Sequence, residues 1–154
     1  MVRVNGLFLS IIILLWTAAT ALGQQGGPQP GSKECRPISG LGSTENAFKQ
    51  RPWVARRIES LTGEDSALNA CSKIGDTGLC LIAAQVSNNL HIKFDCLRSD
   101  ITGTPSQASS TCPADTGHRK MNLKGSIQHL KPDVDAKLAI KEATADAESW
   151  ACLP

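Results

Sequence analysis

The chain has 154 residues, enough for one domain, and its formal net charge is only +2. A balance this close to neutral argues against a dedicated nucleic-acid or anionic-membrane binder. Aromatic residues make up 4% of the chain and there is no Tyr. Because the core also needs these rings, few remain for stacking against sugars or single-stranded bases.

The first 23 residues have the pattern of a secretory signal peptide. Residues 7–16 are apolar except for Ser10, and Ala21 and Gly23 are small residues at the positions that a signal peptidase reads. The apolar run is too short to span a bilayer comfortably. We therefore expect residues 1–23 to be a signal peptide and the product to be secreted, into the extracellular space or the periplasm of a bacterium, without stable membrane insertion.

The rest of the chain divides into a leader and one domain. Residues 24–34 are rich in Gly, Pro and polar side chains, which predicts a flexible leader. Residues 35–154 contain every cysteine and are predicted to form one disulfide-bonded helical domain. Within it, residues 102–111 are rich in Ser, Thr and Pro, which indicates an exposed loop.

An even number of cysteines in an exported chain predicts three disulfides and no free thiol. A structural zinc site usually needs ligands only a few residues apart. The closest cysteines here, Cys71 and Cys80, have eight residues between them, so a metal site is not expected. The sequence does not choose among the possible pairings. The cysteines predicted to pair are Cys35, Cys71, Cys80, Cys96, Cys112 and Cys152.

Apolar residues recur at helical spacing along most of the domain, and the first two helices have recognisable start or stop residues. Pro52 can begin a helix, because its missing N–H costs nothing in the first turn, and Gly63 can end it. The apolar stripe of this helix consists of Val54, Ile58 and Leu61. Residues 64–66 begin a short second helix. Its expected stripe is Leu68, Cys71 and Ile74.

Three further helices follow. Thr77 can cap the third, which we expect to end near Asn89. The fourth covers residues 123–130 and stops before Pro132. The fifth and longest begins at residues 132–135, with Val134, Leu138, Ala145 and Ser149 expected along one side. Together these segments predict an all-α fold, a small disulfide-stapled bundle of about five helices.

Residues 90–96 alternate apolar and polar side chains, which is the best strand pattern in the chain. No second segment of this kind offers a pairing partner. We therefore interpret the segment as an extended link, or as the start of a helix near Phe94, with Cys96 and Leu97 facing inward.

The tripeptide Asp-Thr-Gly occurs at residues 76–78 and again at residues 115–117. The pair resembles the active-site signature of aspartic proteases, in which two carboxylates share a proton. That chemistry needs each loop to follow a hydrophobic strand, and neither motif here does. Asp, Thr and Gly are also ordinary turn and helix-capping residues. The motifs therefore predict turns and caps.

The histidines are the remaining candidates for catalysis. No G-x-S-x-G elbow or H-E-x-x-H spacing surrounds His91, His118 or His129. The nearest sequence-local carboxylate is Asp95, four residues after His91. Each histidine is therefore expected at the surface or half-buried, and no catalytic, cofactor-binding or metal residue is predicted.

These observations favour a non-enzymatic binding module for a protein partner or a small apolar ligand, with no cofactor and no nucleic acid. The alternative is a secreted hydrolase that uses His91 or His118 with a carboxylate. A purely structural secreted protein is a third reading. Two basic groups, residues 51–57 and residues 118–124, are expected to be solvated, with weak binding of an acidic partner as the other possibility.

Overall fold

The computed structural model describes residue 38 and residues 41–105 and 111–152. The predicted signal peptide and leader, Cys35 and the middle of the predicted loop lie outside these residues. The described part of the chain contains seven helices and no strand. The all-α class is therefore confirmed, with seven helices in place of about five.

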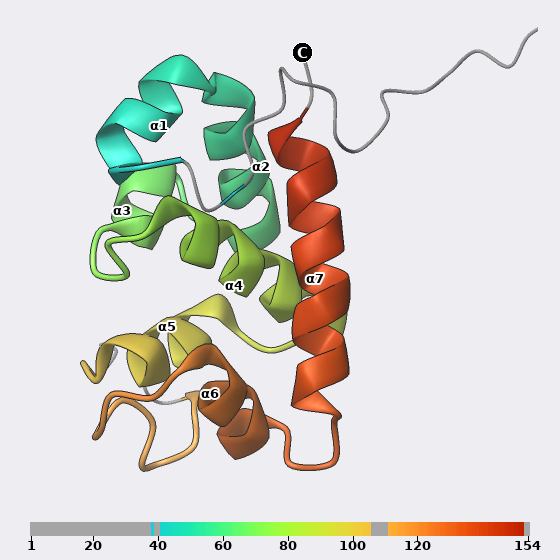
Figure 1. Ribbon diagram of the computed structural model, residues 1–154. Helices are drawn as coiled ribbons and strands as arrows, with labels where there is room; N and C mark the ends of the chain where they lie inside the picture. The colour runs from blue at the N-terminus through green and yellow to red at the C-terminus, as the bar shows by residue number, and fades with distance from the viewer. Residues whose placement is uncertain (1–37, 39–40, 106–110, 153–154) are drawn as a thin grey trace, which may run out of the picture.

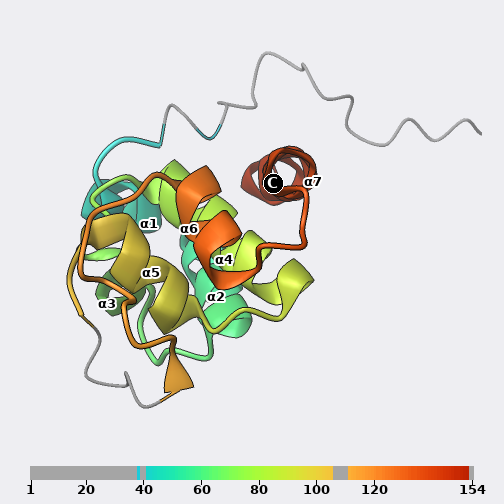
Figure 2. The same ribbon diagram turned by 90° about the horizontal axis from the view of Figure 1, so that it is seen from below.

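The helices pack around α4, which contacts α2, α3, α5 and α7. The long helix α7 runs along one side of the molecule, and α5 and α6 lie together at the end opposite α1 (Figure 1). In Figure 2, α7 is seen nearly end-on beside the other helices. The helices are α1 (Thr44–Gln50), α2 (Pro52–Thr62), α3 (Ala67–Cys71), α4 (Thr77–Leu90), α5 (Phe94–Thr102), α6 (Leu123–Leu130) and α7 (Ala136–Ala151).

Helix α2 has the bounds that Pro52 and Gly63 predict. Pro52 is its first residue, and Gly63 ends it in the left-handed conformation with φ of 71°. The Gly63 N–H donates to the Glu59 carbonyl, so the last turn stays hydrogen-bonded. Val54 and Ile58 are fully buried, as expected from the stripe.

The predicted inner face of α7 is wrong, and that of α3 is confirmed only in part, because Cys71 is buried and Ile74 packs against the core but Leu68 is exposed. Leu68 and Leu138 are 46% and 50% exposed. Small residues form the buried faces instead: Ala67, Ala70 and Cys71 on α3, and Ala136, Ala143, Ala147 and Ala151 on α7. Alanine allows two helix backbones to approach closely, so the packed face of α7 is its alanine face rather than its leucine face.

Residues 90–96 form a helix end, a turn and a helix start. His91 ends α4 in the left-handed conformation, with φ of 52°, and α5 begins at Phe94. The apolar residues on either side of this turn all face the core, which explains the alternating pattern. Cys96 and Leu97 are buried, so the interpretation as a helix start near Phe94 is confirmed. Helix α1 was not predicted; it buries Ala47 and Phe48.

Two disulfides connect neighbouring elements. Cys71–Cys80 joins α3 to α4, and Cys96–Cys112 joins α5 to the segment that follows it. Cys152 is also disulfide-bonded. No cysteine of the described residues is free. None of the helices in that same part of the chain is long and apolar enough to cross a membrane.

Candidate functional site

Three ionisable side chains from separate parts of the chain meet beside α6. His129 lies in the last turn of α6, with its Nδ1 2.7 Å from Asp100 Oδ2 and its Nε2 3.0 Å from Asp115 Oδ1. Asp100 belongs to α5, and Asp115 to the segment between α5 and α6. We call Asp100, His129 and Asp115 the carboxylate–histidine cluster. It is the arrangement in the described residues closest to a catalytic site.

Asp100 is fully buried, and both of its carboxylate oxygens have partners. Oδ2 contacts His129, and Oδ1 accepts a hydrogen bond of 2.8 Å from the Gly117 N–H. The Asp100 backbone carbonyl accepts another, also of 2.8 Å, from the Met121 N–H. A buried carboxylate is tolerated only when it is paired and hydrogen-bonded in this way. Asp100 therefore attaches the segment before α6 to α5.

The cluster favours the charged form of the histidine. The hydrogen bond to Asp100 is the main cause that raises the pKa of His129, and the contact with Asp115 acts in the same direction. The hydrogen bond from His129 in turn lowers the pKa of Asp115. Only an imidazolium carries an N–H on both ring nitrogens. The two contacts thus form together when His129 is protonated.

The second Asp-Thr-Gly motif wraps around this cluster. Asp115 contacts His129, Thr116 is buried, and the Gly117 N–H donates to Asp100. Gly117 has φ of 79°, and a Cβ there would lie 2.9 Å from the backbone of Pro105. The motif is a turn, as predicted, but its pairing with a distant histidine was not foreseen.

The first Asp-Thr-Gly motif begins α4. The Asp76 carboxylate accepts a hydrogen bond of 2.6 Å from the Leu79 N–H, so Asp76 is the N-cap in place of the predicted Thr77. Gly78 lies against Ile38, where a Cβ would be 2.4 Å from a side-chain carbon. Because Asp76 caps its own helix and Asp115 pairs with His129, the two carboxylates do not form a proton-sharing pair.

The histidines named for the hydrolase alternative lie elsewhere. His91 and His118 are both exposed, and in the described part of the chain neither side chain contacts a carboxylate. His129, which the sequence placed at the surface or half-buried, is the one that meets carboxylates. The sequence does contain a signal for Asp100, because on a helix this charged residue shares a face with the apolar Leu97 and Ile101. Its partner is 29 residues further along the chain, and no local pattern connects the two.

The cluster contains two of the three members of a Ser–His–Asp triad, the histidine and the buried Asp. In such a triad a buried Asp holds Nδ1 of the histidine, and Nε2 is free to take a proton from the nucleophile. Here the Asp115 carboxylate occupies Nε2. The nearest hydroxyl along α6, that of Ser126, is bonded to the Asn122 carbonyl. Among the described residues, no three His, Cys, Asp or Glu side chains could hold a metal ion. The cluster therefore has the geometry of an electrostatic clamp.

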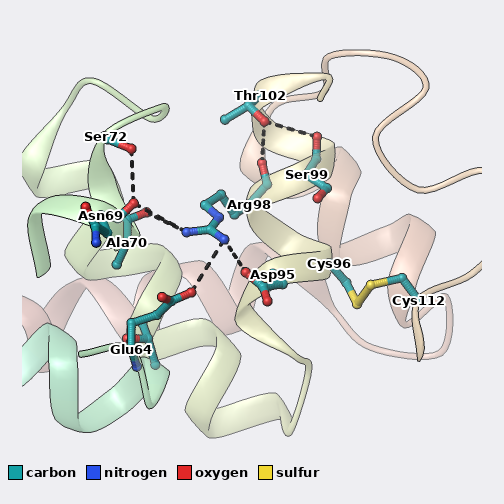
Figure 3. Close-up of polar contacts among 11 residues, drawn as sticks. Glu64, Asn69, Ala70, Ser72, Asp95, Cys96, Arg98, Ser99, Thr102 and Cys112 are labelled. Atoms are coloured by element: carbon teal, nitrogen blue, oxygen red, sulfur yellow. Dashed lines mark hydrogen bonds and ion pairs between the residues drawn. A yellow bond between two sulfur atoms is a disulfide. The ribbon is translucent and has the colours of Figure 1, made fainter. Parts of the chain in front are cut away.

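A second polar cluster surrounds Arg98 on α5. Figure 3 shows its guanidinium between α5 and the region of α3. It pairs with Asp95 on its own helix and lies 3.5 Å from Glu64 Oε1. It also reaches the backbone carbonyls of Asn69 and Ala70, at 3.4 and 3.5 Å. Arg98 thus ties α5 to α3 and to the turn before it, a structural role.

A third feature lies where α2 meets the end of α7. The Arg57 guanidinium stacks over the Trp150 ring, 4.3 Å from its centroid, and Arg57 Nη2 donates to Gln85 on α4. The Gln85 side-chain amide in turn donates a hydrogen bond to the Asp146 carboxylate on α7. Arg56, the next residue along α2, is exposed. We call Arg56, Arg57 and Trp150 the α2–α7 face.

Comparison of the chain with protein-family models, with curated proteins and with solved structures gives no significant match.

The charge state of His129 gives a prediction about pH and stability. Its folded pKa is raised, so its contribution to the free energy of unfolding is fully present below the ordinary value of 6.5. That contribution is lost as the pH rises through the folded pKa. The lowered pKa of Asp115 acts at the other end: its stabilisation is present above 3.8 and is lost as the pH falls through the folded value.

We expect urea unfolding to show this dependence when wild type is compared with His129→Gln. The wild-type advantage should be largest near about pH 6 and should shrink towards about pH 9, because only the wild type has the His129 proton that is lost there. His91 and His118 are present in both proteins, so they do not contribute to the difference between them. A stability difference that stays constant across this range would contradict the assignment.

Proposed function

We propose that this protein is a secreted, non-enzymatic binding module whose partner is another protein. The observation that carries the proposal is the double engagement of His129, whose two ring nitrogens both face carboxylates. While both contacts are made, neither ring nitrogen is available to activate a nucleophile or a water molecule. The described cysteines are disulfide-bonded and supply no thiol nucleophile. His129, its two carboxylate partners and the described cysteines are thus engaged in contacts that hold the fold.

Two features support secretion. Disulfides form and persist mainly in oxidising compartments, and this chain has bridges at Cys71–Cys80 and Cys96–Cys112. Residues 1–23 have the pattern of a signal peptide.

Helix α7 favours a protein partner over a small apolar ligand between the helices. Its buried residues are all alanine, and its main packing partner is α4. Such small side chains bring helix backbones together, whereas a ligand site needs a cavity of several hundred Å³, about 300 or more. This side of the bundle is therefore best filled by direct contact between helices.

The α2–α7 face is the surface that we assign to the partner. Arg and Trp are the residue types most enriched at the centres of protein interfaces. Because Arg57 is already stacked on Trp150, less side-chain freedom is lost on binding. Arg56, the preceding residue of α2, is exposed and adds a second positive charge to this part of α2, so an acidic patch on the partner fits this face.

The experiment compares the mature protein with Arg56→Glu and with a matched control, Lys124→Glu, which reverses an exposed charge on α6. Each protein is immobilised and exposed to the secreted proteins of its source, and the affinity for any retained protein is then measured with purified components. We expect Arg56→Glu to weaken binding about tenfold or more, and Lys124→Glu to leave it unchanged. Hydrolysis of an ester or peptide by the wild type that disappears in His129→Gln, with unchanged circular dichroism, would overturn the proposal.

The alanine face of α7 gives a separate prediction. Ala147→Leu should destabilise the protein by about 1–3 kcal/mol, because Ala147 is fully buried and the larger side chain would force the helices apart. Ala145→Leu is the control, since Ala145 is exposed on the same helix. Urea unfolding of both variants measures the difference. Equal stability of the two variants would favour a ligand cavity at α7 instead.

A further inference from the structure

We propose that the carboxylate–histidine cluster is a pH-operated latch, in which deprotonation of His129 releases Asp115 and loosens residues 111–122 from α5 and α6. In this proposal the two carboxylates behave differently: Asp100 keeps its contact with His129, whereas Asp115 loses it. The segment concerned leads from the Cys96–Cys112 bridge to the start of α6.

A disulfide and several hydrogen bonds hold the segment after Thr111. The disulfide anchors its beginning at Cys112, and Asp100 accepts hydrogen bonds from Gly117 and Met121 further along. Between them, the Asp115 carboxylate contacts His129. Only Thr116 and Gly117 are buried in this segment, so apolar packing adds little to these attachments. The contact between Asp115 and His129 is therefore a large part of what holds the middle of the segment in place.

The burial of the two carboxylates decides which contact breaks. A neutral imidazole keeps one N–H and presents a lone pair on its other nitrogen. Asp100 is fully buried and would pay a high desolvation cost without a partner, whereas the Asp115 side chain is 75% exposed and can be solvated. The remaining N–H therefore stays on Nδ1 towards Asp100. The Nε2 lone pair then repels Asp115, which turns into water.

The charges around the cluster support this order. Within the described residues, the charged groups that act on His129 are Asp100 from α5 and Asp115 from the segment, and none comes from α7. Both raise the pKa of His129, which places the release above the ordinary histidine range. The hydrogen bond from His129 and, to a smaller extent, the charge of Arg119 lower the pKa of Asp115, so this carboxylate is already ionised when His129 loses its proton.

Residue-resolved amide exchange of the mature, disulfide-intact protein tests the latch. The N–H groups of Thr116, Gly117 and His118 are all hydrogen-bonded in the closed segment. We expect their protection factors, corrected for the intrinsic effect of pH, to fall about tenfold as the His129 ring signals titrate. The Gly63 N–H at the end of α2 is the internal control and should not change.

Asp115→Asn is the decisive variant. The Asn side chain can accept a hydrogen bond from the imidazolium and can donate one to the neutral ring, so it stays attached in both states. The pH-dependent fall in protection should disappear in this variant and in His129→Gln. Wild-type protection factors that do not change through the His129 titration would overturn the proposal, as would the same fall in Asp115→Asn.

Discussion

Replacing Asp100 by Ala should destabilise the protein by about 3 kcal/mol, measured by urea unfolding near neutral pH. The expected loss is large because Asp100 is fully buried and bonds to two partners. Without it, the Gly117 N–H is left without an acceptor, and the charged His129 loses its buried counter-ion. Leaving either of these buried partners without its hydrogen bond costs more free energy than the hydrogen bond itself contributes to stability.

The control is Asp115→Ala, which removes the exposed carboxylate of the same histidine. Its loss should be clearly smaller, because solvent already screens this contact. Asp100→Asn should fall between the two, since an amide oxygen can still accept one of the hydrogen bonds. If Asp100→Ala is no less stable than Asp115→Ala, burial does not control the energetics of the cluster.

The parts of the fold that follow from the sequence are those with local causes. Proline at the start of α2 and glycine at its end fix the bounds of this helix through their own backbone preferences, without reference to the rest of the molecule. Asp76 and Asp135 cap α4 and α7 for similarly local reasons. Sequence patterns could therefore locate the helices α2, α3, α4, α6 and α7.

The faces of the helices depend on their neighbours. The sequence predicts Val134, Leu138, Ala145 and Ser149 along one side of the helix that is α7, but Leu138 is exposed and Ala147 is fully buried. Close approach of α7 to α4 favours the smaller side chain, and this distance is a property of the assembled bundle. The same limit applies to the cluster, because the contact between Asp100 and His129 depends on how α5 packs against α6.

The Cys96–Cys112 bridge should contribute about 3 kcal/mol to stability, because it closes a loop with a sequence separation of 16 and restricts the unfolded chain. The measurement is urea unfolding of the double variant Cys96→Ala/Cys112→Ala. The matched control is Cys71→Ala/Cys80→Ala, which removes a bridge with a separation of 9 at the junction of α3 and α4. By loop length alone the control should lose slightly less.

The two bridges should differ more in their coupling to the cluster. Cys112 lies three residues before Asp115, so the bridge helps to hold that carboxylate near His129. Once the Cys96–Cys112 bridge is removed, Asp115→Ala should cost less than it does in the intact protein, a non-additive result in a double-mutant cycle. In the background without Cys71–Cys80, Asp115→Ala should cost its full amount, because that bridge joins other elements. Additive effects in both backgrounds would mean that the bridge and the cluster hold the segment independently.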